Sequence, residues 1–313
     1  MNRTYLSLDL GGTKLLVGEV NEQGDVLNYK RYQTGYINQE SALDIIRESV
    51  DNYLSVVGWA TNERPVAMGV GLIGRVNNAT GVWHQIDIDR TTPLQLAKEL
   101  SIAYDMPCYA DNDVKAATRA ERLWGYGQRT KDFIYINIGT GIAAGIVTGG
   151  ALVRGGHCNA GEVGHTNVGI KLGLQCVCGR EDCVELIASG IGFDKSARFL
   201  KDMHHTSLFI PADERVDVRE VYRLSREGDE LCTCLVENAA WAISNLIMNL
   251  VRVTDPDTVV LGGGIVSSGF LYQKIIEKLN QHTMRFVTNG VVLTKLDPDF
   301  IGLIGAAAVA MNK

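Results

Sequence analysis

Apolar and polar residues alternate in the first part of the chain, on both sides of a Gly-Gly break. The alternation in YLSLDLGGTKLLVGEVNEQGDVL, residues 5–27, has the period of half-buried strands and predicts a strand, a glycine turn and a second strand. Gly24-Asp25 is typical of a turn between two strands. Helical spacing follows over residues 40–57, and residues 66–76 predict a buried strand that ends in a glycine turn.

The second half of the chain repeats this plan. FIYINIGTGIAAGIVTGGALV, residues 133–153, again predicts a strand, a Gly-Thr-Gly turn and a strand. LDLGGT and INIGTG therefore look like two versions of one unit. Other segments predict helices at 94–104, 229–253 and 270–282, a strand end followed by a helix at 108–125, a buried strand ending in three glycines at 257–269, and a small-residue helix able to pack tightly on a sheet at 301–311.

Strands that alternate with helices indicate an α/β fold, and the repeated unit suggests two similar domains facing a cleft. No Pro-rich or Ser-rich linker marks the boundary between them, which we infer near residues 113–118. We expect residues 1–115 and a C-terminal helix at about 301–313 to form a smaller N-terminal domain. Residues 116–300 are expected to form the larger domain.

Composition narrows the class of protein. The chain has 313 residues, of which 46% are hydrophobic and 21% charged, as in ordinary soluble globular proteins. Its net charge of −6 argues against nucleic acid as a partner, because phosphate binding needs a basic surface. The start of the chain does not resemble a signal peptide, and the apolar stretch 239–253 contains Asn, Ser and Arg, so it predicts a core helix rather than a membrane span. Seven clustered cysteines suit a reducing compartment, so we expect a cytoplasmic protein without a membrane partner.

Asp9-Leu10-Gly11-Gly12-Thr13-Lys14 is the first candidate for chemistry. Glycines after a strand let backbone N–H groups approach a phosphate, Thr13 adds a hydroxyl donor and Lys14 adds a positive charge. Phosphate would repel Asp9 unless a cation such as Mg²⁺ lay between them, so Asp9 implies a metal–nucleotide complex. A glycine-rich turn that binds nothing is the alternative for this segment taken alone.

Two further glycine turns follow buried strands, at Gly139-Thr140-Gly141 and at Gly262-Gly263-Gly264. Three such turns together point to a nucleotide bound between domains. Asn112-Asp113 ends another strand, where a carboxylate is well placed to act as general base toward a substrate hydroxyl. The local sequence favours the simpler alternative, a helix N-cap, which Asn and Asp commonly form.

Sulfur is concentrated in one segment. Cys176, Cys178 and Cys183 lie within eight positions, and His165 precedes the first of them by eleven residues. Three Cys and one His can satisfy tetrahedral Zn²⁺. A C-x-x-C redox pair is absent, and a reducing compartment disfavours a disulfide. The spacing therefore predicts a structural zinc site.

Taken together, these motifs resemble the ROK family of bacterial sugar kinases and related repressors, which has the actin-like ATPase (ribonuclease H-like) fold. The likeness runs nearly end to end. It rests on DLGGTK at 9–14, ND at 112–113 with Glu121 further along its helix, IGTG at 138–141, GEVGH at 161–165, CVCGREDCVE at 176–185, LGGG at 261–264 and GLIGAAAVA at 302–310.

The resemblance implies an ATP-dependent hexose kinase that binds a sugar and ATP. Asp113 would take the proton from the sugar hydroxyl, usually the 6-OH, and His165 would serve both as zinc ligand and as sugar contact. Other sugar contacts would be Gly74, Asn112, Glu162 and Glu185. The Mg²⁺–ATP phosphates and nucleotide would be held by Asp9, Gly11, Gly12, Thr13, Lys14, Gly139, Thr140, Gly141 and Gly263. Helices of the larger domain would mediate dimerisation, giving a homodimer or homotetramer.

Several residues depart from the family pattern. Asp87 stands where an Asn commonly contacts the sugar, and as an acceptor it would favour a hydroxyl or ammonium donor. Ile73 replaces the usual Pro before Gly74, and Lys115 stands where a small or amide residue is common. Ala143 and Ala144 replace glycines, and Asp182 replaces the glycine usual before the last zinc cysteine. These departures weaken an assignment of plain glucose as the substrate.

The favoured reading is a kinase for glucose or a close hexose relative. Kinases for N-acetylmannosamine or N-acetylglucosamine, and for β-glucosides, are alternatives within the family. The repressor branch carries a DNA-binding domain before the DLGGTK motif, and only eight residues precede Asp9 here, so a sugar-responsive regulator without that domain is a remote alternative.

Overall fold

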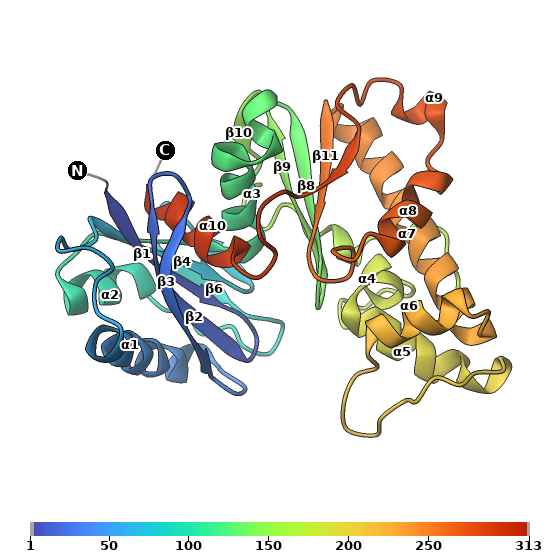
Figure 1. The fold of residues 1–313 in the computed structure, drawn as a ribbon, viewed down its shortest axis with the longest axis horizontal. Coiled ribbons are helices and arrows are strands. Elements are labelled where there is room, and N and C mark those ends of the chain that lie inside the picture. Colours follow the sequence, from blue (N-terminus) through green and yellow to red (C-terminus); the bar gives the residue numbers. More distant parts are fainter. Residues whose placement is uncertain (1–2, 312–313) are drawn as a thin grey trace. The chain divides into compact units, whose positions relative to one another are not determined.

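The computed structural model describes residues 3–311 and divides the chain into two compact units (Figure 1). Unit 1 comprises Met1–Gln128, Arg154–Ala160 and Lys295–Lys313, and unit 2 comprises Arg129–Val153 and Gly161–Thr294. Each unit contains one five-stranded sheet together with helices, which confirms the predicted α/β class. The outermost residues of the predicted N-terminal domain, 1–2 and 312–313, lie outside the described residues.

The sheet of unit 1 has the order β3-β2-β1-β4-β7. The first three strands pair antiparallel, whereas β1, β4 and β7 run parallel. The strands are β1 (Thr4–Leu10), β2 (Lys14–Asn21), β3 (Val26–Gln33), β4 (Ala67–Leu72) and β7 (Cys108–Asn112), with a separate hairpin of β5 (Arg75–Asn77) and β6 (Val82–Gln85). Strand β1 is almost wholly buried, and β3 alternates between half-buried and exposed positions, as expected for an outer strand of the sheet.

The described residues of unit 1 also form four α-helices: α1 (Gln39–Val56), α2 (Leu96–Tyr104), α3 (Asp113–Trp124) and α10 (Ile301–Ala310). Helix α10 packs against β4, β1 and α3. A Cβ on Gly69 of β4 would lie 1.8 Å from the Ala306 carbonyl oxygen, and one on Gly305 would lie 2.7–2.9 Å from the backbone of Ala116 and Ala117. Glycine is therefore required at Gly69, where β4 approaches α10, and at Gly305, where α10 approaches α3, which confirms the predicted small-residue packing.

The sheet of unit 2 has the order β10-β9-β8-β11-β12 and repeats the arrangement of unit 1. Strands β8 and β9 are antiparallel, and β8, β11 and β12 are parallel. The strands are β8 (Phe133–Ile138), β9 (Ile142–Thr148), β10 (Ala151–Leu152), β11 (Thr258–Gly262) and β12 (Val291–Leu293). The hairpins β1–β2 and β8–β9 are thus equivalent, as the repeated glycine-hairpin pattern predicted.

The helices of unit 2 are α4 (Val184–Ala188), α5 (Gly190–Leu200), α6 (Val218–Arg226), α7 (Glu230–Thr254), α8 (Phe270–Lys278) and α9 (Gln281–Met284). The single helix predicted at 270–282 is two helices. Leu279 is extended, with φ −72° and ψ 130°, and the Asn280 side chain accepts a hydrogen bond from Thr283 N that starts α9. An N-cap inside the predicted helix therefore divides it.

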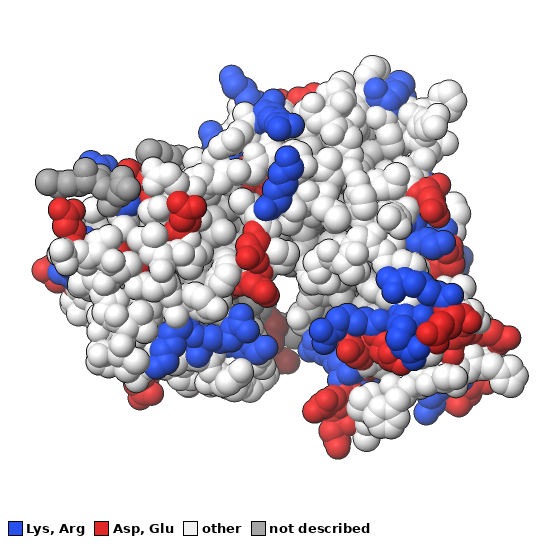
Figure 2. All heavy atoms as spheres, in the orientation of Figure 1, with Lys and Arg blue, Asp and Glu red and all other residues white. Residues whose placement is uncertain are grey.

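Helix α7 is the one helix of residues 3–311 with the length and composition of a membrane span. However, 61% of its most apolar window is buried inside the protein, as expected for the core helix predicted there. In the orientation of Figure 2, positive and negative side chains are intermixed over the region of α5 and α6. Arg223 of α6 pairs with both Glu220 and Glu227.

The units divide the chain at different residues from the predicted domains. Helix α3 lies wholly in unit 1, because it packs against α10 and β4, whereas the prediction cut the chain after residue 115. The segment Arg154–Ala160 also belongs to unit 1, although residues of unit 2 flank it in the sequence.

Candidate active site and metal centre

The Asp9–Lys14 turn joins β1 to β2. Gly11 N donates to the Lys14 carbonyl at 2.9 Å, and Gly12, Thr13 and Lys14 are exposed. A Cβ on Gly12 would meet no atom within 4 Å, so packing among the described residues does not account for glycine at this position. The tip of the hairpin can therefore present its backbone N–H groups to a ligand.

Asp9 lies at the end of β1 in a space that glycines leave open. A Cβ on Gly302 of α10 would lie 2.1 Å from Asp9 Oδ2, and one on Gly71 would lie 3.7 Å from Asp9 Oδ1 and 3.8 Å from Asp113 Cα. Asp9 and Asp113 thus lie on either side of Gly71. Burial, and then the charge of Asp113, raise the pKa of Asp9 to about 7. Two neighbouring carboxylates at a strand end suit an oxygen-preferring cation such as Mg²⁺.

Asn112 and Asp113 have different local roles. The Asn112 side chain caps α3 by accepting from Val114 N at 3.1 Å and Lys115 N at 3.2 Å, so the N-cap alternative holds for Asn112. Its Nδ2 donates to the Gly74 carbonyl at 3.0 Å. Asp113 is the first residue of α3 and half-buried, and its Oδ1 accepts from Val114 N at 2.8 Å. The structure therefore brings the predicted Asn112, Asp113 and Gly74 together.

Gly74 and Asp87 lie on two segments that touch. Gly74 has φ +81°, and a Cβ there would lie 2.1 Å from the Gln85 carbonyl oxygen, which explains the glycine. The Asp87 carboxylate accepts hydrogen bonds from Asp89 N, Arg90 N and the Arg90 guanidinium. Bonding to Arg90 holds the pKa of Asp87 below its ordinary value. Asp87 thus stabilises its own turn, a use that the sequence did not reveal.

In unit 2 the two predicted glycine turns adjoin each other. Gly139 N donates to the Gly141 carbonyl at 3.0 Å and closes the turn between β8 and β9. Gly263, after β11, has φ +92°, and a Cβ on it would lie 2.4 Å from the Ile138 carbonyl oxygen. Only glycine fits this approach, and it brings Gly263 to the end of β8 beside the Gly139 turn.

Glu185 lies against the same turn. Its Oε2 accepts from Ile142 N at 3.0 Å, and a Cβ on Gly141 would lie 2.5 Å from that oxygen. Glu185 is in the first turn of α4, two residues after Cys183. Glu185, which we predicted to bind the sugar, therefore lies beside Gly141, which we predicted to bind the nucleotide.

The segment Gly161–His165 lies along β9 through two glycines. A Cβ on Gly161 would lie 2.0 Å from the Ala144 carbonyl oxygen, and one on Gly164 would lie 2.2 Å from that of Ile142. Ala144 N donates to the Gly161 carbonyl at 2.8 Å. This packing fixes the backbone on either side of Glu162, which is exposed, and leads into His165.

The predicted zinc ligands form one cluster. One donor atom from each of His165, Cys176, Cys178 and Cys183 lies within 4.8 Å of all the others. Cys176 Sγ is 3.4 Å from His165 Nδ1, and Cys178 Sγ is 3.5 Å from Cys183 Sγ. A tetrahedral Zn²⁺ with Zn–S bonds of about 2.3 Å needs donor separations of roughly 3.8 Å. The soft donor set and its spacing fit Zn²⁺.

Asp182 orders the loop that carries these cysteines. It is buried with φ +52°, a left-handed conformation that glycine would adopt without strain. Its carboxylate accepts from Gly173 N at 3.1 Å and Leu174 N at 2.9 Å, and its own N–H donates to the Leu174 carbonyl at 2.9 Å. Asp182 thus has a structural use, because it joins the two ends of the loop.

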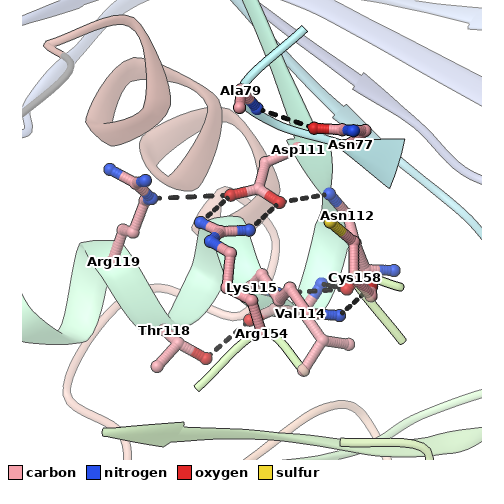
Figure 3. Close-up of polar contacts among 10 residues, drawn as sticks. All are labelled: Asn77, Ala79, Asp111, Asn112, Val114, Lys115, Thr118, Arg119, Arg154 and Cys158. Carbon is pink, nitrogen blue, oxygen red and sulfur yellow. Dashed lines mark hydrogen bonds and ion pairs between the residues drawn. The ribbon is translucent and has the colours of Figure 1, made fainter. Parts of the chain in front are cut away.

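Sequence reasoning missed a buried ion-pair network beside Asn112. Asp111 is completely buried, and Arg154 binds both of its carboxylate oxygens (Figure 3). Arg154 is 43 positions further along the chain, and neither residue belongs to a recognisable motif. The indication of this network in the sequence was the position of Asp111, a charged residue, at the end of a buried strand.

The chain is similar to known proteins over nearly its whole length. A family model described as the ROK family matches residues 5–313. Glucokinase of Thermotoga maritima is 27% identical over 98% of this chain and 97% of its own. N-acetylmannosamine kinase of Haemophilus influenzae is 29% identical over 96% of this chain and 93% of its own. The structure of a ROK hexokinase from Thermus thermophilus superposes with a TM-score of 0.76 at 27% identity, covering 100% of this chain and 98% of that chain, which confirms the predicted actin-like fold class.

Proposed function

Because the chain belongs to the ROK family, we propose that this ATP-dependent sugar kinase transfers the γ-phosphoryl group of ATP to a hexose hydroxyl, with Asp113 as general base. The observation that carries the proposal is the position of Asp113. Its carboxylate is half-buried at the start of α3, directly after the parallel strand β7 and within electrostatic range of Asp9. A carboxylate at such a strand end can accept the proton of a substrate hydroxyl.

Phosphoryl transfer requires little covalent chemistry from the protein, because positioning of the reactants and neutralisation of charge provide most of the rate enhancement. We assign the nucleotide to Asp9, Gly11, Gly12, Thr13 and Lys14 in unit 1, and to Gly139, Thr140, Gly141 and Gly263 in unit 2. Mg²⁺ bound through Asp9 would neutralise charge on the phosphates. The exposed hairpin tip, with its free space around Gly12, supports the first assignment.

We assign the sugar to Gly74, Asn112 and Asp113 in unit 1, and to Glu162, His165 and Glu185 in unit 2. The hydrogen bond from Asn112 Nδ2 to the Gly74 carbonyl supports grouping the first set. Asp87 stays a predicted sugar contact, but its carboxylate already receives four donors from Asp89 and Arg90, which nearly fills its lone-pair sites.

Zn²⁺ would be held by His165, Cys176, Cys178 and Cys183. Its chemistry would be structural, because four protein ligands leave no open coordination position. Through His165 and the adjacent segment Gly161–Gly164 the metal would hold the backbone that carries Glu162. This role explains why a metal loop would be built next to a sugar-binding segment.

Glucose or a close hexose relative is the substrate that we propose. N-acetylmannosamine and N-acetylglucosamine are the second candidates, supported by the similarity to the N-acetylmannosamine kinase of Haemophilus influenzae. β-Glucosides are the third. We also propose that the protein acts in the cytoplasm as a homodimer or homotetramer.

The test is a coupled assay of ADP release over a panel of hexoses, N-acetylated amino sugars and β-glucosides. One of these classes is expected to support sugar-dependent ADP release, and the ranking identifies the substrate. Absence of sugar-dependent turnover across the panel, in protein shown to bind a sugar, would favour the sugar-responsive regulator instead.

Asp113→Asn tests the base. We expect kcat to fall by about 10²- to 10⁴-fold, the usual contribution of general acid–base catalysis, while the Kd of the sugar changes little. Isothermal titration with the sugar and the coupled assay measure the two quantities. A variant with near-wild-type kcat would refute the assignment of Asp113, although the sugar kinase activity itself would stand.

A further inference from the structure

A completely buried carboxylate precedes the proposed base by two residues. Asp111 lies near the end of β7, and its two oxygens accept Arg154 Nη1 at 2.8 Å and Nη2 at 2.7 Å (Figure 3). Asp111 Oδ1 also accepts from Asn112 N at 2.9 Å, and Arg119 Nε of α3 lies 3.5 Å from Oδ2. A buried carboxylate needs such compensation, because its desolvation is costly.

Arg154 begins a short loop that is anchored in unit 1. The segment Arg154–Ala160 closes on itself, since Ala160 N donates to the Arg154 carbonyl at 3.1 Å. Its second anchor is Lys115, a buried residue one turn after Asn112 on α3, whose Nζ donates to the Cys158 carbonyl at 3.2 Å (Figure 3). Cys158 has φ +58°, so its backbone is held in a conformation that few residues adopt unaided.

The loop joins two parts of the proposed sugar site along the chain. Its anchors are Asp111 and Lys115, which flank Asn112-Asp113 in the sequence. Its last residue, Ala160, is followed directly by Gly161 and Glu162. One network of side chains therefore restrains the backbone that flanks the proposed base and the loop that directly precedes Gly161 and Glu162 in the sequence.

We propose that Arg154 and Lys115 are positioning residues that fix the loop Arg154–Ala160 against β7 and α3, and that through it they set the placement of the sugar relative to Asp113. The proposal rests on the proposed function and deepens it, since neither residue is assigned a contact with the sugar or the nucleotide. Misplacement of reacting groups by about 1 Å can cost on the order of 100-fold in rate, so loss of a restraint of this kind is expected to slow the reaction.

The length of the Lys115 side chain matters for this restraint. Its ammonium group, at the end of four methylenes, is what allows α3 to reach the Cys158 carbonyl.

The experiment compares Arg154→Ala, Arg154→Lys and Lys115→Met with the wild-type protein. Arg47→Lys, which alters an Arg–Glu pair between α1 and α2 of the same unit, is the matched control. The KM for the sugar, the KM for ATP and kcat are measured separately, with and without guanidinium chloride well below denaturing concentrations.

In Arg154→Ala we expect kcat/KM for the sugar to fall by about 10- to 100-fold while the KM for ATP stays within about twofold. Guanidinium should restore part of the loss, because it can replace the missing group on Asp111. Arg154→Lys should be impaired and not rescued, since its ammonium fills part of the space without the bidentate geometry. Lys115→Met should raise the KM for the sugar, and Arg47→Lys should match the wild-type protein.

Three results would overturn the proposal. They are kinetic constants of Arg154→Ala and Lys115→Met within about twofold of wild type, equal effects on the KM for sugar and ATP, and a loss that follows the melting temperature across all variants without rescue. If Arg154→Ala does not fold, Lys115→Met carries the test, because methionine keeps much of the length of the lysine side chain while removing the hydrogen bond to the Cys158 carbonyl.

The same variants separate this proposal from the proposed function. If the wild-type protein phosphorylates no sugar, the proposed function fails, and hydrogen exchange then tests the restraint by itself. Peptides covering residues 154–165 should exchange faster in Lys115→Met and Arg154→Lys than in the wild-type protein. Unchanged exchange would refute the positioning role, whatever the activity.

Discussion

Replacing Asp182 by glycine tests how the zinc loop is held. The glycine removes two hydrogen bonds, from Gly173 N and Leu174 N, to a buried carboxylate that lies beside Cys183. It also relieves the left-handed backbone at φ +52°, which an aspartate adopts at a cost and a glycine does not. The two effects have opposite signs, so their magnitudes decide the outcome.

Hydrogen bonds to a charged acceptor contribute about 1.5–3 kcal/mol each. Gly173 is exposed and Leu174 half-buried, so water replaces part of the loss, and the low end of the range applies, giving about 3 kcal/mol for the pair. Relief of the left-handed conformation returns about 1 kcal/mol. The net loss of about 2 kcal/mol corresponds to an affinity for Zn²⁺ weaker by roughly 30-fold, because the loop must be ordered for its ligands to converge.

Competition with a chromophoric chelator measures the zinc affinity of each variant. Asp255→Gly is the matched control, because Asp255 has a similar left-handed backbone, with φ +46°, at the exposed end of α7. That variant should keep the zinc affinity of the wild-type protein. Equal or tighter zinc binding by Asp182→Gly would refute the reasoning, since it would mean that backbone strain outweighs the hydrogen bonds of Asp182.

Three further outcomes are expected. In Mg²⁺-free buffer the free energy of unfolding should fall as pH rises from about 4 to about 7, because the pKa of Asp9 is about 7 in the folded protein and ordinary in the unfolded chain. Urea titrations at several pH values measure this change, and Asp9→Asn should lack the part that is due to Asp9. An equal dependence of the unfolding free energy on pH in the wild-type protein and in Asp9→Asn would contradict the prediction. Gly69→Ala should lower stability by about 1–3 kcal/mol in thermal melts, because its Cβ would meet the Ala306 carbonyl, whereas Gly156→Ala, with no atom within 4 Å, should not. Light scattering on a sizing column should give two or four times the mass of one chain, and a monomer would refute the expected self-association.

The strands and the repeated hairpin were predictable because their signals are local. Alternation around Gly11-Gly12 and around Gly139-Thr140-Gly141 is enough to specify two strands and a turn. The zinc cluster was predictable for the same reason, since all four side chains fall between His165 and Cys183. In both cases the informative residues lie close together in the sequence.

The features that the sequence did not predict depend on contacts between residues far apart in the sequence, or on competition between a capping residue and the helical spacing around it. No pattern links Asp111 to Arg154, because an ion pair leaves no periodic signal. The division of the helix at 270–282 is set by Asn280, whose capping hydrogen bond outweighs the helical spacing around it. Asp182 was recognised as unusual, but its two backbone partners, Gly173 and Leu174, could be identified only in the folded loop.

The tight fit of α10 against β4 also bears on the order in which the protein folds during synthesis. Helix α10 contributes Leu303, Ala307 and Ala310 to a cluster with Tyr5, Leu16 and Val20 of the first strands. That part of the unit 1 core can therefore form only after residue 310 has left the ribosome. Most of unit 2 is a continuous stretch, Gly161–Thr294, and emerges earlier. We expect unit 2 to become compact first, and the packing of α10 against Tyr5, Leu16 and Val20 to form only after α10 has been synthesised.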